Sequence, residues 1–116
     1  MMRWIYVAAC GALGLLGAVH VAATPQFFPA LTPSALWFAA GGLWMILVAA
    51  LNFLNRSYGK AAPGLRTVCV ISNAVLTGFA IIQGLVGHAG IGQWSVVLSI
   101  LIPMLLLSAS RRVQAR

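Results

Sequence analysis

Two histidines, His20 and His88, are the side chains of this sequence best suited to chemistry. An imidazole titrates near neutral pH, hydrogen-bonds and ligates metals. Each histidine closes a similar apolar segment: residues 14–20 read GLLGAVH, and residues 84–88 read GLVGH. Both are therefore candidates for ligand binding or proton handling, and a facing pair would be able to hold haem b or hydrogen-bond to a quinone.

The surroundings of the two histidines favour a simpler interpretation. Haem carries two propionates, and no Lys or Arg lies near either histidine in the sequence to meet them. A zinc site wants three or four ligands, and two histidines fall short of that. We therefore expect neutral imidazoles that hydrogen-bond to backbone or water, with no metal and no resident cofactor. Haem b stays as an alternative.

The chain contains no Asp or Glu. This absence removes hard-metal sites, two-carboxylate hydrolysis and the acid that orients a Ser–His nucleophile. Small proton-coupled multidrug transporters are similar in length and helix number, but they rely on a membrane-embedded acid that this chain lacks. We therefore predict that the protein is not an enzyme.

Four apolar runs must position these residues. Hydrophobic residues make up 62% of the chain and charged residues only 6%, far from the composition of soluble domains. The runs cover residues 4–23, 35–54, 67–86 and 94–108, and about 20 helical residues cross a bilayer. The sequence predicts an all-α membrane protein, with residues 1–116 forming a single four-transmembrane-helix bundle. We also consider a parallel two-plus-two repeat of helix hairpins.

The basic residues predict how the chain is threaded. All seven lie at the ends or in the middle connection: Arg3, Arg56, Lys60, Arg66, Arg111, Arg112 and Arg116. The other two connections carry no charge, so the positive-inside rule places both termini in the cytoplasm. We expect a multi-pass protein of the bacterial inner membrane that does not bind nucleic acid. Its partners are the bilayer and, through the basic face, anionic lipids.

Helical periodicity gathers small and polar residues into stripes, which is typical of faces where membrane helices meet. In the second run the stripe contains Trp44 and Asn52, and in the third it contains Asn73 and Thr77. Asn52 and Asn73 lie at comparable depths, so we expect them to hydrogen-bond, while Trp44 needs an acceptor for its N–H. These polar residues either pack the bundle or line a cavity for a small ligand, and packing is the simpler explanation.

The fourth run contains Pro103, which removes a backbone hydrogen bond and predicts a helix kink.

Three functions remain open. The first is a non-catalytic accessory or assembling subunit, either a homo-oligomer or part of a larger membrane complex. The second is a haem- or quinone-associated membrane anchor that uses His20 and His88. The third is an oligomeric carrier or pore for a neutral or anionic small solute.

Overall fold

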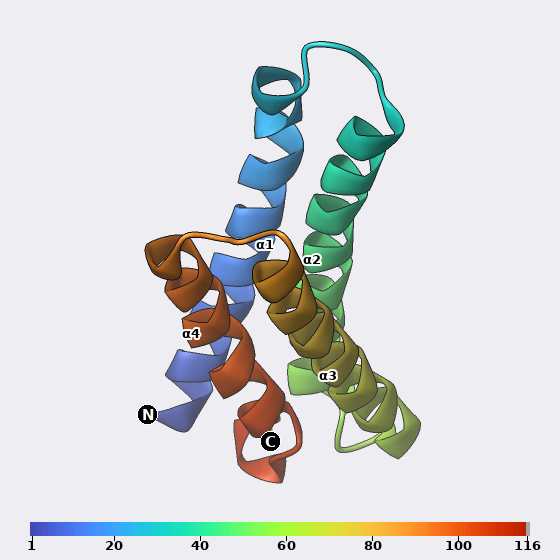
Figure 1. Ribbon diagram of the computed structural model, residues 1–116. Coiled ribbons are helices and arrows are strands. Elements are labelled where there is room, and N and C mark those ends of the chain that lie inside the picture. The colour runs from blue at the N-terminus through green and yellow to red at the C-terminus, as the bar shows by residue number, and fades with distance from the viewer. Residues whose placement is uncertain (116) are drawn as a thin grey trace.

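Four long helices make up nearly all of the protein in this computed structural model, which describes residues 1–115 (Figure 1). They are α1 (Met2–Phe27), α2 (Pro33–Tyr58), α3 (Pro63–Val86) and α4 (Ile91–Ser108), followed by a short 3-10 helix, η1 (Arg111–Val113). The fold is all-helical, and each of the four long helices is long and apolar enough to cross a membrane. A helix of 20 residues spans about 30 Å, the thickness of a bilayer core.

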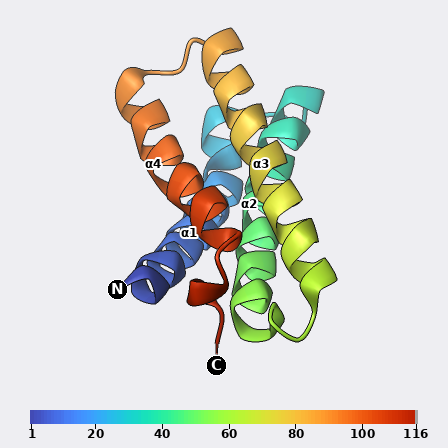
Figure 2. The ribbon, with the colours of Figure 1, turned by 90° about the horizontal axis from the view of Figure 1, so that it is seen from below.

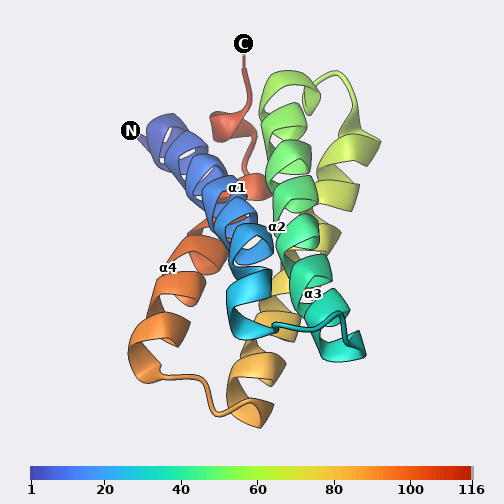
Figure 3. The same ribbon diagram turned by 90° about the horizontal axis from the view of Figure 1, so that it is seen from above.

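The helices form two hairpins, α1–α2 and α3–α4, that pack against each other (Figure 1). The N-terminus, the α2–α3 connection and η1 lie at one end, which we call the basic end because the described Lys and Arg residues are there (Figure 2). The α1–α2 and α3–α4 connections lie at the other, uncharged end. These two connections are well separated in the views of Figures 1 and 3, so the hairpins diverge toward the uncharged end.

Each helix extends beyond the apolar run that predicted it, and α2 and α3 begin at recognisable starting signals. The Thr32 hydroxyl accepts a hydrogen bond from the Ala35 N–H at 3.2 Å, and Pro33 occupies the first position of α2. Pro63 likewise occupies the first position of α3, although its N-cap residue, Ala62, makes no side-chain capping bond. The basic connection predicted at residues 55–66 therefore shrinks to residues 59–62, and Arg56 and Arg66 belong to helical turns.

The first hairpin is held by a close crossing of α1 and α2 at Gly17 and Gly42. A Cβ on Gly17 would lie 2.5 Å from the carbonyl oxygen of Gly42, and one on Gly42 would lie 2.7 Å from that of Gly17. No side chain fits between these two backbones. Small residues at such a point let membrane helices approach closely and gain dispersion contacts along their length.

The stripes expected to face inward are buried over the half of the bundle near the basic end. Tyr6 and Leu13 of α1 are fully buried, as are Asn52 of α2 and Asn73 of α3. Pro103 lies inside α4, which runs continuously from Ile91 to Ser108, and its kink stays a prediction.

His88 follows the end of α3 in a left-handed backbone conformation, with φ of 49°. The Ala89 N–H bonds the Gly84 carbonyl at 3.1 Å, the pattern of a Schellman cap, whose left-handed position is usually glycine. We expect His88→Gly to raise the free energy of unfolding by up to about 1 kcal/mol, because glycine has no Cβ penalty there. Denaturation in mixed micelles followed by circular dichroism measures this, with the exposed Gln93→Gly as the destabilising control. A stability loss in His88→Gly would show that the strain of a left-handed backbone conformation does not determine stability at this position.

Candidate functional site

Asn52 and Asn73 form a paired amide contact between α2 and α3. The Asn52 amide donates to the Asn73 Oδ1 at 2.8 Å, and the Asn73 amide donates back to the Asn52 Oδ1 at 2.9 Å. The Asn52 Oδ1 also accepts from the Tyr6 hydroxyl at 2.6 Å and from the Cys69 Sγ at 3.3 Å. Thr77, one turn further along α3, donates to the Asn73 carbonyl at 2.7 Å. Three helices therefore meet at one buried amide pair.

Asn55 extends this network to α4 and to the segment after it. Its amide donates to the Tyr6 hydroxyl at 3.2 Å and to the Ser108 carbonyl at 3.1 Å, and its Oδ1 accepts from the Gln114 amide at 3.1 Å. Gln114 is only 1% exposed. We call Tyr6, Asn52, Asn55, Cys69, Asn73 and Gln114 the amide network, and it joins all four helices with the C-terminal segment.

The C-terminal segment is tied to the bundle by two further contacts. Arg3 donates to the Gln114 carbonyl at 2.8 Å, and the Ala115 N–H bonds the Arg56 carbonyl at 2.6 Å. The sequence indicates only a basic tail here, because a glutamine among arginines carries no signal of burial. Gly59 was equally unmarked, yet a Cβ on it would collide with Asn55 and Gln114.

The amide network is suited to holding helices together rather than to catalysis. Most of its polar atoms pair with one another, the buried Gln114 Oε1 being an exception, and none of its members carries a carboxylate or an imidazole. Cys10 and Cys69 are both buried free thiols. Hydrogen-bonded polar groups in an apolar interior favour one arrangement of helices, because another arrangement would leave more of them without partners.

Beyond the amide network, toward the uncharged end, the bundle opens into a cavity of about 570 Å³ between α2 and the α3–α4 hairpin. Its lining includes seven rings: His20, Phe28, Trp37, Phe38, Trp44, Phe79 and Trp94. Three of the chain's four tryptophans are among them. No Lys or Arg lines this cavity, which we call the aromatic cavity. Its volume lies within the range typical of small-ligand sites.

Only one of the two histidines belongs to the aromatic cavity. His20 lines it and stacks on Phe38, with ring centroids 3.9 Å apart and planes inclined by 16°. His88 is exposed and lies outside the lining. Within residues 1–115, no hydrogen bond or ring contact joins the two histidines, and no group of three or more potential metal ligands occurs.

Two of the tryptophans that line the cavity have indole N–H groups without a hydrogen-bond partner in residues 1–115. Trp44 packs against Phe79, with centroids 5.8 Å apart, and no hydrogen bond joins its N–H to residues 1–115. The Trp94 N–H is buried and also lacks a partner. The Trp94 indole lies against Gly84, where a Cβ would come within 2.5 Å of its Nε1.

Trp37 and Trp94 both line the cavity, a role that the sequence did not indicate. The stripe of α3 divides between the amide network at Asn73 and the cavity at Gly84. A sequence signal was present, since the same helical stripe carries both Asn73 and Gly84. The sequence does not indicate that the hairpins diverge, which leaves part of this stripe without a packing partner.

No protein-family model, no curated protein and no solved structure matches this chain. Its function must therefore be argued from the amide network, the aromatic cavity and the distribution of charge.

Proposed function

We propose that the protein is a multi-pass inner-membrane protein, with both termini in the cytoplasm, that binds a neutral quinone-like ligand in the aromatic cavity. It acts without catalysing a reaction itself, as an accessory subunit of a homo-oligomer or a larger membrane assembly. The observation that carries the proposal is the large aromatic cavity without a charged residue in its lining.

Membrane placement is supported by helix length and by charge. Four apolar helices alternate in direction, and the described basic residues lie at one end of them. Basic residues are retained on the cytoplasmic side during insertion. A fluorescent protein fused after Arg116 is expected to fluoresce, whereas a periplasmic phosphatase fused there is expected to be inactive. The opposite pair of results would reverse the orientation.

The chemistry of the cavity selects a flat, neutral ligand with hydrogen-bond acceptors. Stacked and tilted rings favour a planar partner. Within residues 1–115 the Trp44 N–H makes no hydrogen bond, and the imidazole of His20 supplies another polar group. Burying a charge in such a lining would leave it without a counter-ion, which is costly. A quinone ring, with two carbonyl acceptors and an apolar tail, meets these conditions.

Haem b fits this cavity poorly. Its lining has a single histidine, His20, and no basic residue to meet the propionates. The arrangement of a facing histidine pair, which the sequence left open, is not present in the cavity. We therefore assign His20 to ligand binding and His88 to the end of α3.

Quinone binding is measurable through the tryptophans that line the cavity, because quinones quench indole fluorescence. A short-chain benzoquinone should quench the purified protein saturably. Gly41 lines the cavity and has open space at its Cβ, so Gly41→Leu should fill the cavity and weaken binding at least tenfold. Gly11→Leu is the matched control, because Gly11 also has open space but lies outside the cavity. Equal quenching in both variants would indicate partition into detergent and contradict the proposal.

The contribution of His20 is separable from its ring stacking. His20→Phe keeps a ring against Phe38 but removes the imidazole nitrogens. Loss of one hydrogen bond of about 1 kcal/mol corresponds to about fivefold weaker binding. Unchanged affinity in His20→Phe would restrict His20 to packing.

The assembly part of the proposal has its own test. Native mass spectrometry of the protein extracted in mild detergent should show an oligomer or a co-purifying membrane protein. A lone monomer would contradict the accessory-subunit role. Quinone-independent solute flux into liposomes would favour a carrier instead.

A further inference from the structure

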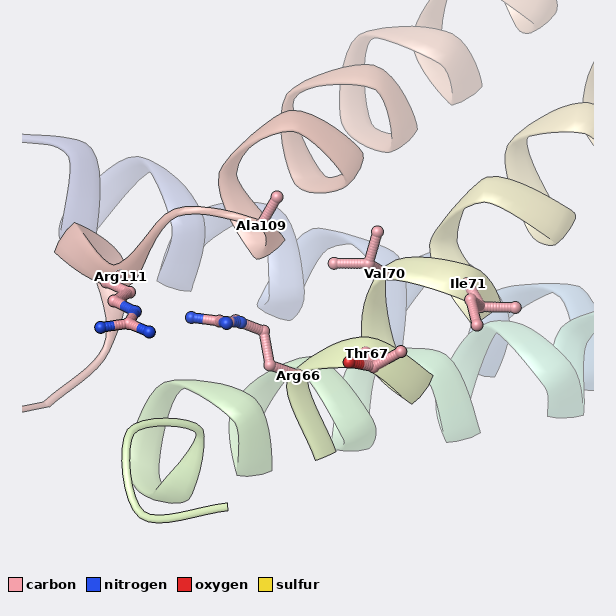
Figure 4. Close-up of a pocket in the computed structure, with 6 residues that line it drawn as sticks. All are labelled: Arg66, Thr67, Val70, Ile71, Ala109 and Arg111. Carbon is pink, nitrogen blue, oxygen red and sulfur yellow. The ribbon is translucent and has the colours of Figure 1, made fainter. Parts of the chain in front are cut away.

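A second hollow, a groove of about 440 Å³, lies at the basic end between the start of α3 and the segment after α4 (Figure 4). Its lining consists of Arg66, Thr67, Val70, Ile71, Ala109 and Arg111. Figure 4 shows the guanidinium group of Arg66 reaching toward that of Arg111, so that the two groups are neighbours in this view. We call it the arginine groove.

The two facing arginines have no acidic side chain to neutralise them, because the chain contains no Asp or Glu. Guanidinium groups stay charged at every physiological pH, so two that face each other repel. Arg66 is half-buried, which reduces the screening of its charge by water. Arg3, at the same end, is used differently: it already donates to the Gln114 carbonyl. An anion between Arg66 and Arg111 would convert repulsion into two attractions.

We propose that the arginine groove binds one anionic phospholipid, with its phosphate between Arg66 and Arg111 and an acyl chain along Val70 and Ile71. The inference rests on the membrane placement proposed above and is independent of quinone binding. Arg66 is the fourth residue of α3, about one turn from its start. In a spanning helix this is the depth of the lipid headgroups.

Three features select an anionic lipid among possible anions. A guanidinium fork matches phosphate oxygens in a bidentate geometry. The wall beyond the arginines is apolar, with Ile71 57% exposed, and a soluble phosphate would make no use of it. A zwitterionic headgroup would bring a further positive charge to a site that already has two. Clustered basic residues at the cytoplasmic surface of a membrane protein attract anionic lipids in general, and this groove gives that attraction a defined position.

Native mass spectrometry of the protein released from nanodiscs tests the proposal, with equal parts phosphatidylglycerol and phosphatidylcholine as the probe lipids. The wild-type protein should retain one phosphatidylglycerol. Arg66→Gln and Arg111→Gln should each reduce retention about tenfold, because each removes a charge-assisted hydrogen bond. Lys60→Gln and Arg112→Gln are matched controls: they remove the same charge from neighbouring positions outside the groove and should retain the lipid.

The controls distinguish lipid binding at a defined site from general electrostatic attraction to the basic end. Equal loss in all four variants, or retention of both lipids alike, would overturn the proposal. Displacement of the bound lipid by millimolar inorganic phosphate would assign the site to a soluble anion and overturn it as well. Arg66→Lys should restore only part of the retention, because an ammonium group lacks the bidentate fork.

Failure of this inference is distinguishable from failure of the proposed function. A wild-type protein that enters nanodiscs and quenches with quinone, yet keeps no phosphatidylglycerol, overturns the lipid site alone. A protein that does not enter nanodiscs or float with vesicles of any composition overturns membrane placement and the lipid site together.

Discussion

Replacing Asn52 with leucine is expected to lower the free energy of unfolding by about 2–3 kcal/mol. Asn52 is fully buried and its side chain contacts Tyr6, Cys69 and Asn73. Leucine leaves the Asn73 Oδ1 without its donor in an apolar interior, and each buried group left unsatisfied costs about 1–3 kcal/mol. Unfolding by sodium dodecyl sulfate in mixed micelles, followed by far-ultraviolet circular dichroism, measures the change.

Two further variants show whether the effect comes from the amide pair. Ser57→Ala on the same helix removes a hydroxyl that bonds only the Phe53 carbonyl, and it should change stability by less than about 0.5 kcal/mol. The double variant Asn52→Leu with Asn73→Leu should be no less stable than Asn52→Leu alone, because removing both partners leaves neither amide unpaired. Additive losses in the double variant would refute a coupled pair.

The second large effect is expected at the crossing of α1 and α2. Gly17→Leu should destabilise the protein by about 3 kcal/mol, the upper part of the range for overpacking. A Cβ at Gly17 would already lie 2.5 Å from the Gly42 carbonyl oxygen, so the two helices must separate to admit any side chain. Separation would also move Tyr6 relative to Asn52, which links the crossing to the amide network.

Gly11→Leu is the matched control for Gly17→Leu. Gly11 lies on the same helix, and a Cβ there finds nothing within 4 Å. The exposed position should accept leucine with unchanged or slightly raised stability, since glycine is a poorer helix former. The same unfolding titration serves both variants. Equal losses at the two positions would mean that the close crossing does not hold the hairpin.

Several contacts in the site were predictable from spacing alone. The pairing of Asn52 with Asn73 follows from their equal depth on neighbouring helices and from the rule that polar membrane residues face other helices. The burial of Tyr6 follows from its place on the stripe of α1 that also carries Leu13 and Gly17. Hydrophobic periodicity is a local property, so a single sequence is enough to find such faces.

Other features of the site had no local signal. Gln114 enters the amide network because the chain turns back after α4, and nothing in a basic segment marks that turn. The aromatic cavity exists because the hairpins diverge, which leaves Trp37 and Trp94 facing unfilled space. Arg66 and Arg111 are 45 positions apart, and only the packing of α3 beside α4 brings their side chains to one groove.

The sequence by itself determined four apolar helices, the segregation of basic residues to one end, and the inward stripe of each helix. These depend on composition and on the 3.6-residue period, both of which are local. The tertiary structure alone decided which stripes close into the amide network, where the bundle opens, and which arginines meet. Those outcomes depend on the offset and angle between helices, and at the α1–α2 crossing Gly17 and Gly42 let the two backbones touch.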